Sequence, residues 1–455
     1  MSCPYSGRKC RGERDPGNVI YYSQKPKCLC TFAKAFIFME QTELIPHLFR
    51  TEYRKIVSVL YKLFGMEHIE IAEDIVSETF LSASELWGLK GLPENPTAWL
   101  YTVAKNKTRD YLKHYSIFTQ KISKEIKYSA ETFHETEIDL SVKNINDSQL
   151  AMIFAVCHPC NTAEAQIGLA LNLLCGFGAG EIANAFLTNK EVIYKRLQRA
   201  KEKLRTEKIK IEQPALAEID KRLPSVLLTL YLLFNEGYYS SNQDVSLRQD
   251  LCLEAMRLTY LLIENDYTNK PAVNALFSLM CFHSSRFEAR INEDGSSILY
   301  EDQDTDLWNK ELIEKGEYYL NLASCGDQLS KYHLEAAIAY WHTHKEDTRE
   351  KWEHVLQLYN QLLQIEYSPI AALNRTFALA KANGKKEAIA EAEKLSLTDN
   401  HLYYTLLGNL YTDVDNAKAL EHYQKALSLT NSNSDKVTIE RNVQKLKVES
   451  SSIQS

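Results

Sequence analysis

Hydrophobic side chains recur every three or four residues along most of this chain, a spacing that predicts amphipathic helices. From position 42 to 115 the pattern predicts consecutive helices, broken at Gly65 and by a loop at 88–96 that is rich in Gly and Pro. The second half of the chain is also predicted to be helical throughout. The pattern therefore predicts an all-α fold class.

The helix predicted at 72–87 is expected to turn four side chains inward, namely Ile75, Thr79, Ala83 and Leu86. Its acidic residues point elsewhere, namely Asp74, Glu78 and Glu85. Thr97 is expected to cap the next helix by accepting a hydrogen bond from its first free amide groups. That helix carries Trp99 and Tyr101, and the segment 103–127 that follows has a local net charge of +5.

Aromatic rings beside a basic stripe fit single-stranded nucleic acid, because rings stack on unpaired bases while cations hold the backbone. This reading favours Trp99 and Tyr101 as strand contacts. The alternative is that these rings belong to the core, and for one of the two we expect that outcome.

Residues 179–205 have the pattern of a helix-turn-helix. Ile182, Ala183 and Phe186 form the apolar stripe of a short helix, and Leu187–Asn189 supply the turn, where Thr188 or Asn189 can cap the next helix. The apolar face of the second helix is expected to hold Val192, Ile193, Leu197, Ala200 and Leu204.

The second of these helices is strongly cationic, and the segment 189–210 has a net charge of +6. Its basic residues are Lys190, Lys195, Arg196, Arg199, Lys201, Lys203 and Arg205. A cationic second helix fits the major groove of DNA. The competing interpretation is a basic surface helix without a partner.

The formal net charge of −7 hides an asymmetry, because residues 1–213 sum to +4 and residues 214–455 to −11. A basic front half can release counterions from a polyanion, whereas an acidic back half fits a protein partner better. With 455 residues and 45% hydrophobic composition, the chain is expected to form two to four soluble domains. No apolar run reaches the roughly 20 residues of a membrane span. We therefore expect a cytoplasmic protein without a membrane partner.

Candidate chemistry is sparse. Cys157 and Cys160 have C-x-x-C spacing, which fits redox or metal chemistry but is expected here to be plain packing, because no second Cys pair lies nearby. The acidic run 301–306 lacks the Gly and the distal Glu of a calcium loop. Without a phosphate-binding Gly loop or a convincing nucleophile, we expect no enzyme activity, no metal and no cofactor.

The blocks AEDIVSETFLSA at 72–83 and NPTAWLYTVAKNKTRDYLKH at 95–114, followed by the helix-turn-helix, resemble the extracytoplasmic-function sigma factors of bacterial RNA polymerase. The stretches at 230–241, 301–316 and 368–380, with CHP at 157–159, resemble the subgroup with a C-terminal tetratricopeptide-like extension. Tyr404, Leu407, Gly408, Tyr411, Ala419, Tyr423 and Ala426 match one repeat.

The resemblance implies two small helical DNA-binding domains joined by a flexible linker. They are region 2 at 39–115, the linker at 116–150 and region 4 at 151–212. A helical extension at 213–330, helical repeats at 331–435 and a tail at 436–455 follow. Residues 1–38 have no counterpart in the family, and we expect a disordered segment or a start codon assigned too early.

The resemblance also implies binding partners. Asp74, Glu78 and Phe80 would meet the clamp helices of core RNA polymerase, and region 4 would meet its flap. Residues 88–95 would form a pocket for a base flipped from the −10 element. The separated promoter strand would contact Trp99, Tyr101, Asn106, Lys107 and Arg109. The −35 element would contact Lys190, Lys195, Arg196 and Arg199.

The sequence departs from the family at Ser77, where Gln is common, and at Cys160, where the subgroup often has a small apolar residue. The implied function is a sigma factor that binds core polymerase and melts promoters, with an extension that regulates it or strengthens its hold. The repeats would offer a groove for a protein or peptide. The alternative is an adaptor whose repeats bind a protein and whose helix-turn-helix only docks it on DNA.

Overall fold

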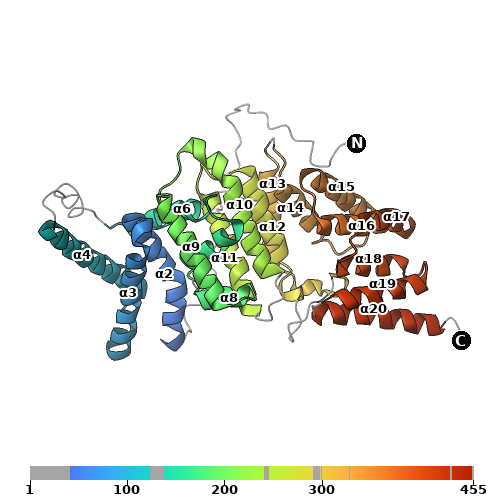
Figure 1. Ribbon diagram of the computed structural model, residues 1–455, viewed down its shortest axis with the longest axis horizontal. Coiled ribbons are helices and arrows are strands. Elements are labelled where there is room, and N and C mark those ends of the chain that lie inside the picture. Colours follow the sequence, from blue (N-terminus) through green and yellow to red (C-terminus); the bar gives the residue numbers. More distant parts are fainter. Residues whose placement is uncertain are drawn as a thin grey trace, which may run out of the picture. The chain divides into compact units, whose positions relative to one another are not determined.

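The computed structural model describes residues 41–122, 138–239, 245–290, 298, 300–326, 328–430 and 433–452. In these parts all regular secondary structure is helical, which confirms the all-α prediction (Figure 1). The chain divides into two compact units, residues 1–233 and residues 234–455. The interpretation of residues 1–38 lies outside the described residues.

The first part of unit 1 consists of α2 (Gln41–Phe64), the short turn η2 (Met66–His68), α3 (Ile69–Lys90) and α4 (Pro96–Ile122). Gly65 ends α2 with a φ of 76°, in the left-handed region that favours glycine. Asn95 caps α4, because its side-chain oxygen accepts the Ala98 N–H at 3.0 Å. The prediction that Thr97 is the cap is therefore wrong, and the helix begins two residues earlier.

The linker prediction for 116–150 is wrong at both of its ends. Helix α4 continues to Ile122, and α6 spans Val142–Val156. Ser141 caps α6 by accepting the Asn144 N–H at 3.3 Å, and Leu150 is buried in its middle. Only 123–137 is left between them, and it lies outside the described residues.

The second part of unit 1 continues with α7 (Ala163–Leu169), the π-helical turn η3 (Ala170–Leu174), α8 (Ala179–Ala185) and α9 (Lys190–Thr206). Asn189 is the cap of α9, since its side chain accepts the Glu191 N–H at 2.9 Å. Ile193, Leu197 and Leu204 of α9 are buried, as expected for its apolar face. A short helix, a turn and a long helix therefore follow in the predicted order.

Helix α10 (Leu216–Tyr238) contains the boundary between the two units. The helix begins eight residues before Pro224 and runs through it and past Gly237. Inside unit 1, Gln166 holds α10, since its Oε1 accepts the Thr229 hydroxyl at 2.8 Å. Arg222 donates a hydrogen bond to the carbonyl of Phe154.

Unit 2 begins with α11 (Val245–Glu264) and α12 (Pro271–Ser284), followed by the short turns η4 (Glu288–Arg290), η5 (Tyr300–Asp302) and η6 (Thr305–Leu307). Then come α13 (Lys310–Ala323) and α14 (Lys331–Trp341). Every residue of α12 from Val273 to Phe282 is buried, so this helix forms the local core. Gly316 of α13 lies so close to the Phe282 ring that a Cβ there would come within 2.6 Å of it.

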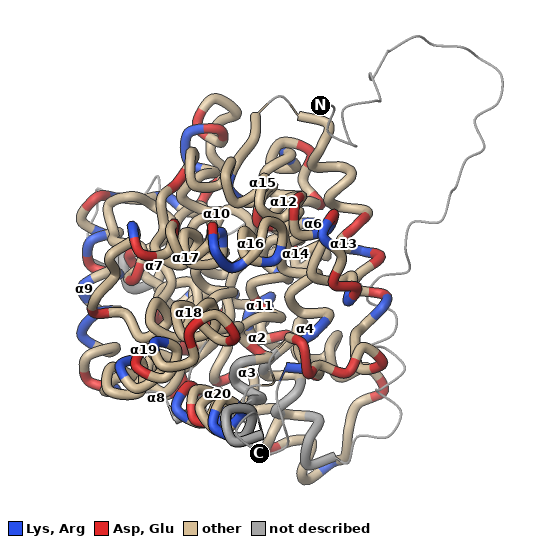
Figure 2. The backbone as a smooth tube through the Cα atoms, turned by 90° about the vertical axis from the view of Figure 1, so that its right-hand side faces the viewer, with Lys and Arg blue, Asp and Glu red and all other residues tan. Residues whose placement is uncertain are grey.

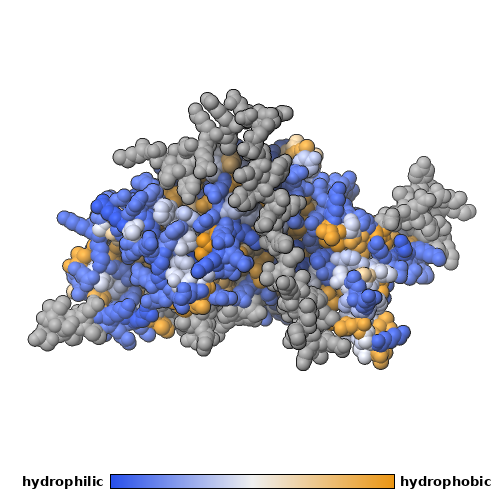
Figure 3. Space-filling model, turned by 180° about the vertical axis from the view of Figure 1, so that it is seen from behind, coloured by the Kyte–Doolittle hydropathy of each residue, from blue (hydrophilic) through white to orange (hydrophobic). Residues whose placement is uncertain are grey.

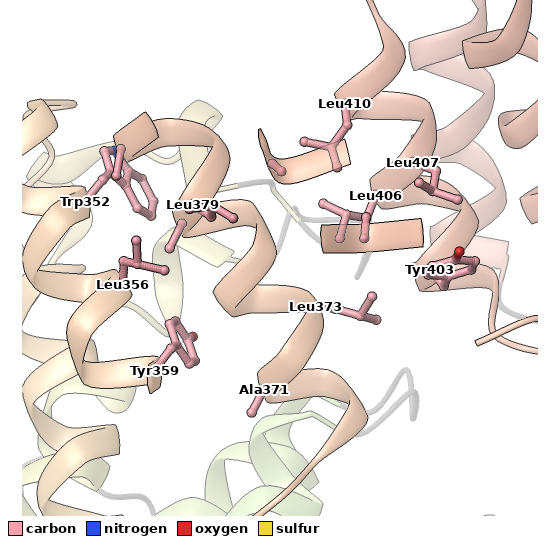
Figure 4. Packing of buried hydrophobic residues seen from close by; sticks show 14 of the residues in the cluster. Trp352, Leu356, Tyr359, Ala371, Leu373, Leu379, Tyr403, Leu406, Leu407 and Leu410 are labelled. Atoms are coloured by element: carbon pink, nitrogen blue, oxygen red, sulfur yellow. The ribbon is translucent and has the colours of Figure 1, made fainter. Parts of the chain in front are cut away.

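The rest of unit 2 is a series of packed helices, α15 (Arg349–Ile365), α16 (Pro369–Asn383), α17 (Lys385–Leu395), α18 (His401–Tyr411), α19 (Asn416–Leu429) and α20 (Asn433–Ser452). Trp352, Leu356 and Tyr359 of α15 pack toward α16, and Leu406 and Leu410 of α18 share the same hydrophobic cluster (Figure 4).

Gly408 and Tyr423 show how closely α18 and α19 approach, because a Cβ on Gly408 would lie 2.6 Å from the Tyr423 ring. The tail predicted at 436–455 is wrong, since α20 covers most of it and buries Ile439 and Leu446. Consecutive helices of unit 2 pack in pairs, and their identity as tetratricopeptide repeats stays a prediction.

Candidate nucleic-acid interface

The outer face of α9 carries positive charge that is open to solvent. Lys190, Lys195 and Arg199 are exposed, whereas Arg196 is half-buried and lies 3.9 Å from a carboxylate oxygen of Glu164. Basic residues recur along this helix in Figure 2. Of the four predicted contacts on α9, three are therefore open to a polyanion and one is partly engaged within the protein.

Two uncharged residues of α9, Val192 and Tyr194, are also exposed to solvent. Val192 is 46% exposed, so the prediction that it lies on the apolar face is wrong. Tyr194 is 63% exposed. Val192 precedes the first buried turn, and its helical angle lies near those of Lys195 and Arg199, which was the available signal. An apolar side chain on a groove-facing helix can contact a thymine methyl group.

The other side of α9 is tied to α3. Lys201 lies 3.3 Å from a carboxylate oxygen of Glu73, and Arg205 pairs with Glu70 and donates through Nε to the Met66 carbonyl at 3.0 Å. Partial burial alone would raise the pKa of Glu70, but the hydrogen bond from Arg205 holds it below its ordinary value. The cations of α9 therefore form two groups, one facing solvent and one joining two parts of unit 1.

Helix α4 presents a mixed aromatic and polar stripe. Trp99, Asn106 and Arg109 follow at helical spacing, with Asn106 and Arg109 exposed and Trp99 half-buried. The Trp99 ring packs edge-to-face on Trp87, with 5.3 Å between ring centroids. Lys107 lies on a different side and pairs with Glu78 at 3.3 Å. The stripe therefore offers one ring and two polar groups on one face.

Tyr101 does not belong to this stripe. Its hydroxyl donates a hydrogen bond to Glu52 at 2.7 Å, and its ring packs against the small cluster formed by Val59, Ile138, Leu140 and Ile145. Burial and the Glu52 carboxylate raise the pKa of Tyr101 well above its ordinary value. Tyr101 is thus the ring that belongs to the core, and its placement along a promoter strand is corrected.

One face of α3 combines acidic and apolar side chains. Asp74, Glu78, Leu81 and Glu85 are exposed and follow at spacings of four, three and four residues, which places them on one face of the helix. Leu81 is 60% exposed and was not identified from the sequence. We call these four residues the α3 stripe. Apolar side chains at such positions are the usual core of a protein contact.

Two predictions for α3 are wrong. Phe80 is 4% exposed and packs against the rings of Phe49 and Tyr53, so it presents no surface to a partner. Leu86 is 38% exposed rather than inward, and Trp87 is buried beside it. A large apolar residue at the end of a helix can face either way. In contrast, Ile75, Thr79 and Ala83 are buried as predicted.

The loop between α3 and α4 is short and exposed. Gly91 has a φ of 81° and donates its N–H to the Trp87 carbonyl at 3.0 Å, which ends α3. Leu89 is 85% exposed and Leu92 is 37% exposed. Asn95 closes the loop as the cap of α4. The loop predicted from residue 88 therefore begins three residues later than expected, because α3 runs to Lys90. Leu89 belongs to the last turn of α3, and Leu92 lies in the loop itself.

The C-x-x-C segment begins in the interior of unit 1 at Cys157 and reaches the surface at Pro159. Cys157 is buried, and burial raises the pKa of its thiol to about 12. A thiol with so high a pKa stays protonated and is a poor nucleophile or metal ligand. The side-chain amide of Gln166 donates to the His158 carbonyl at 3.0 Å and to the Asn161 carbonyl at 2.9 Å. These contacts give the segment a structural role in holding its turn.

Among the residues that the structure describes, no group of three or more His, Cys, Asp or Glu side chains could hold a metal ion. Within the same ranges, no helix is both long and apolar enough to cross a membrane. On the face shown in Figure 3, hydrophobic areas are small and are separated by hydrophilic surface.

Comparison with known proteins gives matches to two families. Residues 48–116 match the family Sigma-70 region 2. This match covers all of α3 and most of α2 and α4. Residues 222–324 match a family of unknown function, DUF6596. An uncharacterized protein of Rhizobium meliloti (strain 1021) is 30% identical over 391 residues, which is 85% of this chain and 92% of that protein. No solved structure gives a significant match.

Proposed function

We propose, from the premise that this chain belongs to the sigma-70 family of transcription initiation factors, that it is a promoter-specificity subunit of RNA polymerase. Factors of this family are not enzymes, and they bind core polymerase and promoter DNA. Within this function, we propose that the α3 stripe contacts the polymerase. Helix α4 and the loop at 88–95 would contact the −10 element, and α9 would contact the −35 element.

The observation that carries this proposal is the division of faces within residues 48–116. The acidic and apolar α3 stripe and the stripe of Trp99, Asn106 and Arg109 belong to two helices of one packed domain. A protein partner and a nucleic-acid strand can then be bound by the same small domain at the same time. Promoter opening requires this arrangement, because the polymerase must hold the domain while the domain holds the separated strand.

For the −10 contact we propose Trp99, Asn106 and Arg109, with Leu89 and Leu92 lining the loop where a flipped base would lie. Flipping costs a few kcal/mol of unstacking, so a ring and apolar side chains must replace the lost stacking. Lys107 contributes through its ion pair with Glu78, which fixes α4 on α3. Tyr101 has no part in this contact.

For the −35 contact we propose Lys190, Lys195 and Arg199, with Val192 beside the last two. Lysines on such a helix chiefly neutralise phosphates, whereas the planar fork of Arg199 can pair with the edge of guanine. Arg196 is a weaker candidate, because its guanidinium is half-buried and lies near Glu164. The partner groups of polymerase would be the clamp helices for α3 and the flap for the α6–α9 part.

The acidic unit 2 is proposed to regulate the factor or to strengthen its hold on polymerase. Its paired helices support this role, because stacked pairs offer a surface to a protein or peptide. The adaptor alternative, in which the helix-turn-helix only docks the protein on DNA, predicts that unit 2 alone contacts the partner. In that case the α3 stripe would be dispensable.

A charge reversal on the α3 stripe tests the polymerase contact. The variant Asp74→Lys with Leu81→Ser should lower the affinity for core polymerase by about tenfold or more, since each lost contact at the centre of an interface costs on the order of 1 kcal/mol. The measurement is binding of labelled protein to purified core polymerase, without promoter DNA. The matched control is Glu67→Lys, which reverses an exposed acid of η2 outside the stripe.

The control should bind as the unchanged protein does. Equal affinity of the stripe variant and the control would remove the α3 stripe from the proposal and would favour the adaptor. Both substituted side chains are exposed, so the fold should survive, and a circular dichroism melt checks this.

A further inference from the structure

Unit 2 buries two cations that have no acidic ion-pair partner among the described residues. Arg286 lies just after α12 and is 7% exposed, and Lys351 lies in the first turn of α15 and is 3% exposed. Burying a charge without a counter-charge is costly, because the solvation by water is lost. Two such cations in one unit call for a compensating group.

Aromatic rings supply part of the compensation. The Arg286 Cζ lies 5.5 Å from the centroid of the Tyr300 ring and 6.0 Å from that of the Trp308 ring. The Lys351 Nζ lies 5.2 Å from the same Tyr300 ring. Both cations therefore lie against the Tyr300 ring and near each other. A ring face attracts a cation, but it leaves the N–H groups of a guanidinium largely without acceptors.

Polar atoms around Arg286 lack hydrogen-bond partners within the described residues. The Nε of Arg286, the Nε1 of Trp308 and the Oε1 of Gln303 are shielded from solvent and unpartnered. A backbone bond of 2.8 Å from the Asn309 N–H to the Ser285 carbonyl joins the segments that carry Arg286 and Trp308. Buried donors are nearly always satisfied in folded proteins, so two such donors beside an uncompensated cation indicate a missing acceptor.

Asp347 is the acidic residue that acts most strongly on Lys351, and its carboxylate already has other partners. Its carboxylate accepts from Trp352 Nε1 and pairs with Lys381 at 2.9 Å. Lys351 instead donates to the Tyr300 hydroxyl at 3.1 Å and to the His344 carbonyl, both of which are uncharged. Lys381 also pairs with Glu301 at 3.6 Å, and the carboxylates of Asp347 and Glu346 attract Lys351. Arg286 is thus left as the buried positive charge with no acid paired to it among the described residues.

Ionisable neighbours of Arg286 respond to its charge. Burial lowers the pKa of Lys351, the Asp347 carboxylate opposes this shift, and repulsion from Arg286 adds to it. The pKa of His342 is about 3, mainly because of burial and then because of Arg286 and Lys351. His342 is therefore neutral and adds no charge. Arg286 and Lys351 both act on His342 as positive charges.

We propose that Arg286 and Trp308 bind a small oxyanion, a carboxylate or a phosphate, and that Lys351 contributes its charge. A guanidinium presents two parallel N–H groups that match two oxygens of such an anion, and the indole N–H adds a third donor. An oxyanion is the partner that satisfies both the unpaired charge of Arg286 and the orphaned donors. The site lies in unit 2 and does not depend on the proposed contacts of α3, α4 and α9.

Isothermal titration of the full-length protein with sodium phosphate, and separately with sodium acetate, tests the proposal at constant ionic strength. At least one of the two anions should bind saturably and raise the melting temperature. Binding by phosphate alone assigns the phosphate class, and binding by acetate alone assigns the carboxylate class. Absence of saturable binding by either anion would overturn the proposal.

The matched variants are Arg286→Gln and Arg349→Gln. Both remove one positive charge from unit 2, but Arg349 is an exposed residue of α15 that pairs with Glu353. Arg286→Gln should weaken anion binding by about tenfold or more, as expected for loss of a charged bidentate partner, while Arg349→Gln should leave it unchanged. Equal weakening in both variants would indicate a diffuse charge effect and would overturn the site.

Two further variants guard against a loss of fold. Arg286→Lys keeps the positive charge but removes the two parallel N–H groups of the guanidinium. This variant should therefore fold and bind the anion with intermediate affinity. Trp308→Phe keeps an aromatic ring and removes the indole N–H, so it should weaken binding with little change in the far-ultraviolet circular dichroism or the melting temperature. If both folded variants bind the anion as tightly as the unchanged protein, the assignment of these two side chains is wrong.

Discussion

Cations lie in opposite surroundings on α9 and inside unit 2. On α9, Lys195 and Arg199 are exposed, whereas in unit 2 Arg286 and Lys351 are buried against aromatic rings. Exposed cations on a helix act together on a polyanion by releasing its counterions, so their effect depends strongly on salt. Buried cations are screened much less. Burial, rather than residue type, therefore separates a surface for DNA from a site for a small anion.

The largest expected effect is on the exposed side of this comparison. The double variant Lys195→Ala with Arg199→Ala should weaken promoter binding by about 100-fold, because two phosphate or base contacts are lost. The slope of log affinity against log salt should fall by about two. Binding is measured by fluorescence anisotropy over a range of salt concentrations. Lys221→Ala, which removes an exposed cation of α10, is the control. A salt slope equal to that of the control would contradict the role of α9.

The next effect separates the strand contact from duplex binding. Arg109→Ala on α4 should lower open-complex formation by about tenfold, an energy near 1.4 kcal/mol, with closed-complex affinity almost unchanged. Permanganate reactivity of unpaired thymines reports opening, and a footprint at low temperature reports the closed complex. Lys62→Ala, an exposed residue at the end of α2, should alter neither. Equal losses in both assays would show that α4 binds duplex DNA as α9 does.

The buried side of the comparison predicts a pH effect. Because the pKa of His342 in the folded protein is about 3, the folded state resists its protonation. The unfolded chain binds this proton near pH 6.5, so stability is complete above pH 6.5 and falls as the pH drops below it. Between pH 7.5 and 5.5 the loss from His342 should be about 1 kcal/mol.

Thermal melts of the unchanged protein and of His342→Gln check this prediction. The variant should lose less stability on acidification, since its side chain takes up no proton. Identical pH dependence of the two proteins would show that His342 is accessible to solvent and that the positive charges of Arg286 and Lys351 do not act on it.

The smallest effect concerns the cations of α9 that face α3. Lys201→Glu places like charges together with Glu73 and should destabilise unit 1 by less than about 1 kcal/mol, since partly exposed pairs contribute little. Combining it with Glu73→Gln, which keeps an acceptor for the Tyr61 hydroxyl, should recover most of the loss. Urea unfolding of the single and double variants measures the coupling. A double variant no more stable than the sum of the single changes would show that this ion pair does not join α9 to α3.

Periodicity in the sequence was sufficient for the helices and for the helix-turn-helix, because a buried stripe repeats every three or four residues whatever its neighbours are. Periodicity could not predict whether a side chain at the edge of a stripe is buried or exposed. Leu86 and Val192 are apolar and lie beside buried positions, but each faces solvent. Phe80 was assigned to a partner but packs instead against the rings of Phe49 and Tyr53 on α2.

For a different reason, the hydrophobic pattern could not predict where each helix begins and ends or which distant residues contact one another. Thr97 and Asn95 are both good caps, and only the backbone geometry selects Asn95. Ile122 and Val142 lie within polar stretches whose helices depend on neighbours elsewhere in the chain. Tyr101 is fixed by Glu52, which lies 49 residues earlier. The cations of unit 2 were missed because nothing in the local sequence shows that Arg286 and Lys351 share Tyr300.

The measurement that tests the central claim most directly is transcription in vitro with purified core polymerase and this protein on a library of bacterial promoters. The proposed function predicts transcripts that start at defined sites, that require the protein and that disappear with the α9 double variant. A chain that fails to bind core polymerase, or that binds it and yields no specific start sites, would contradict the account.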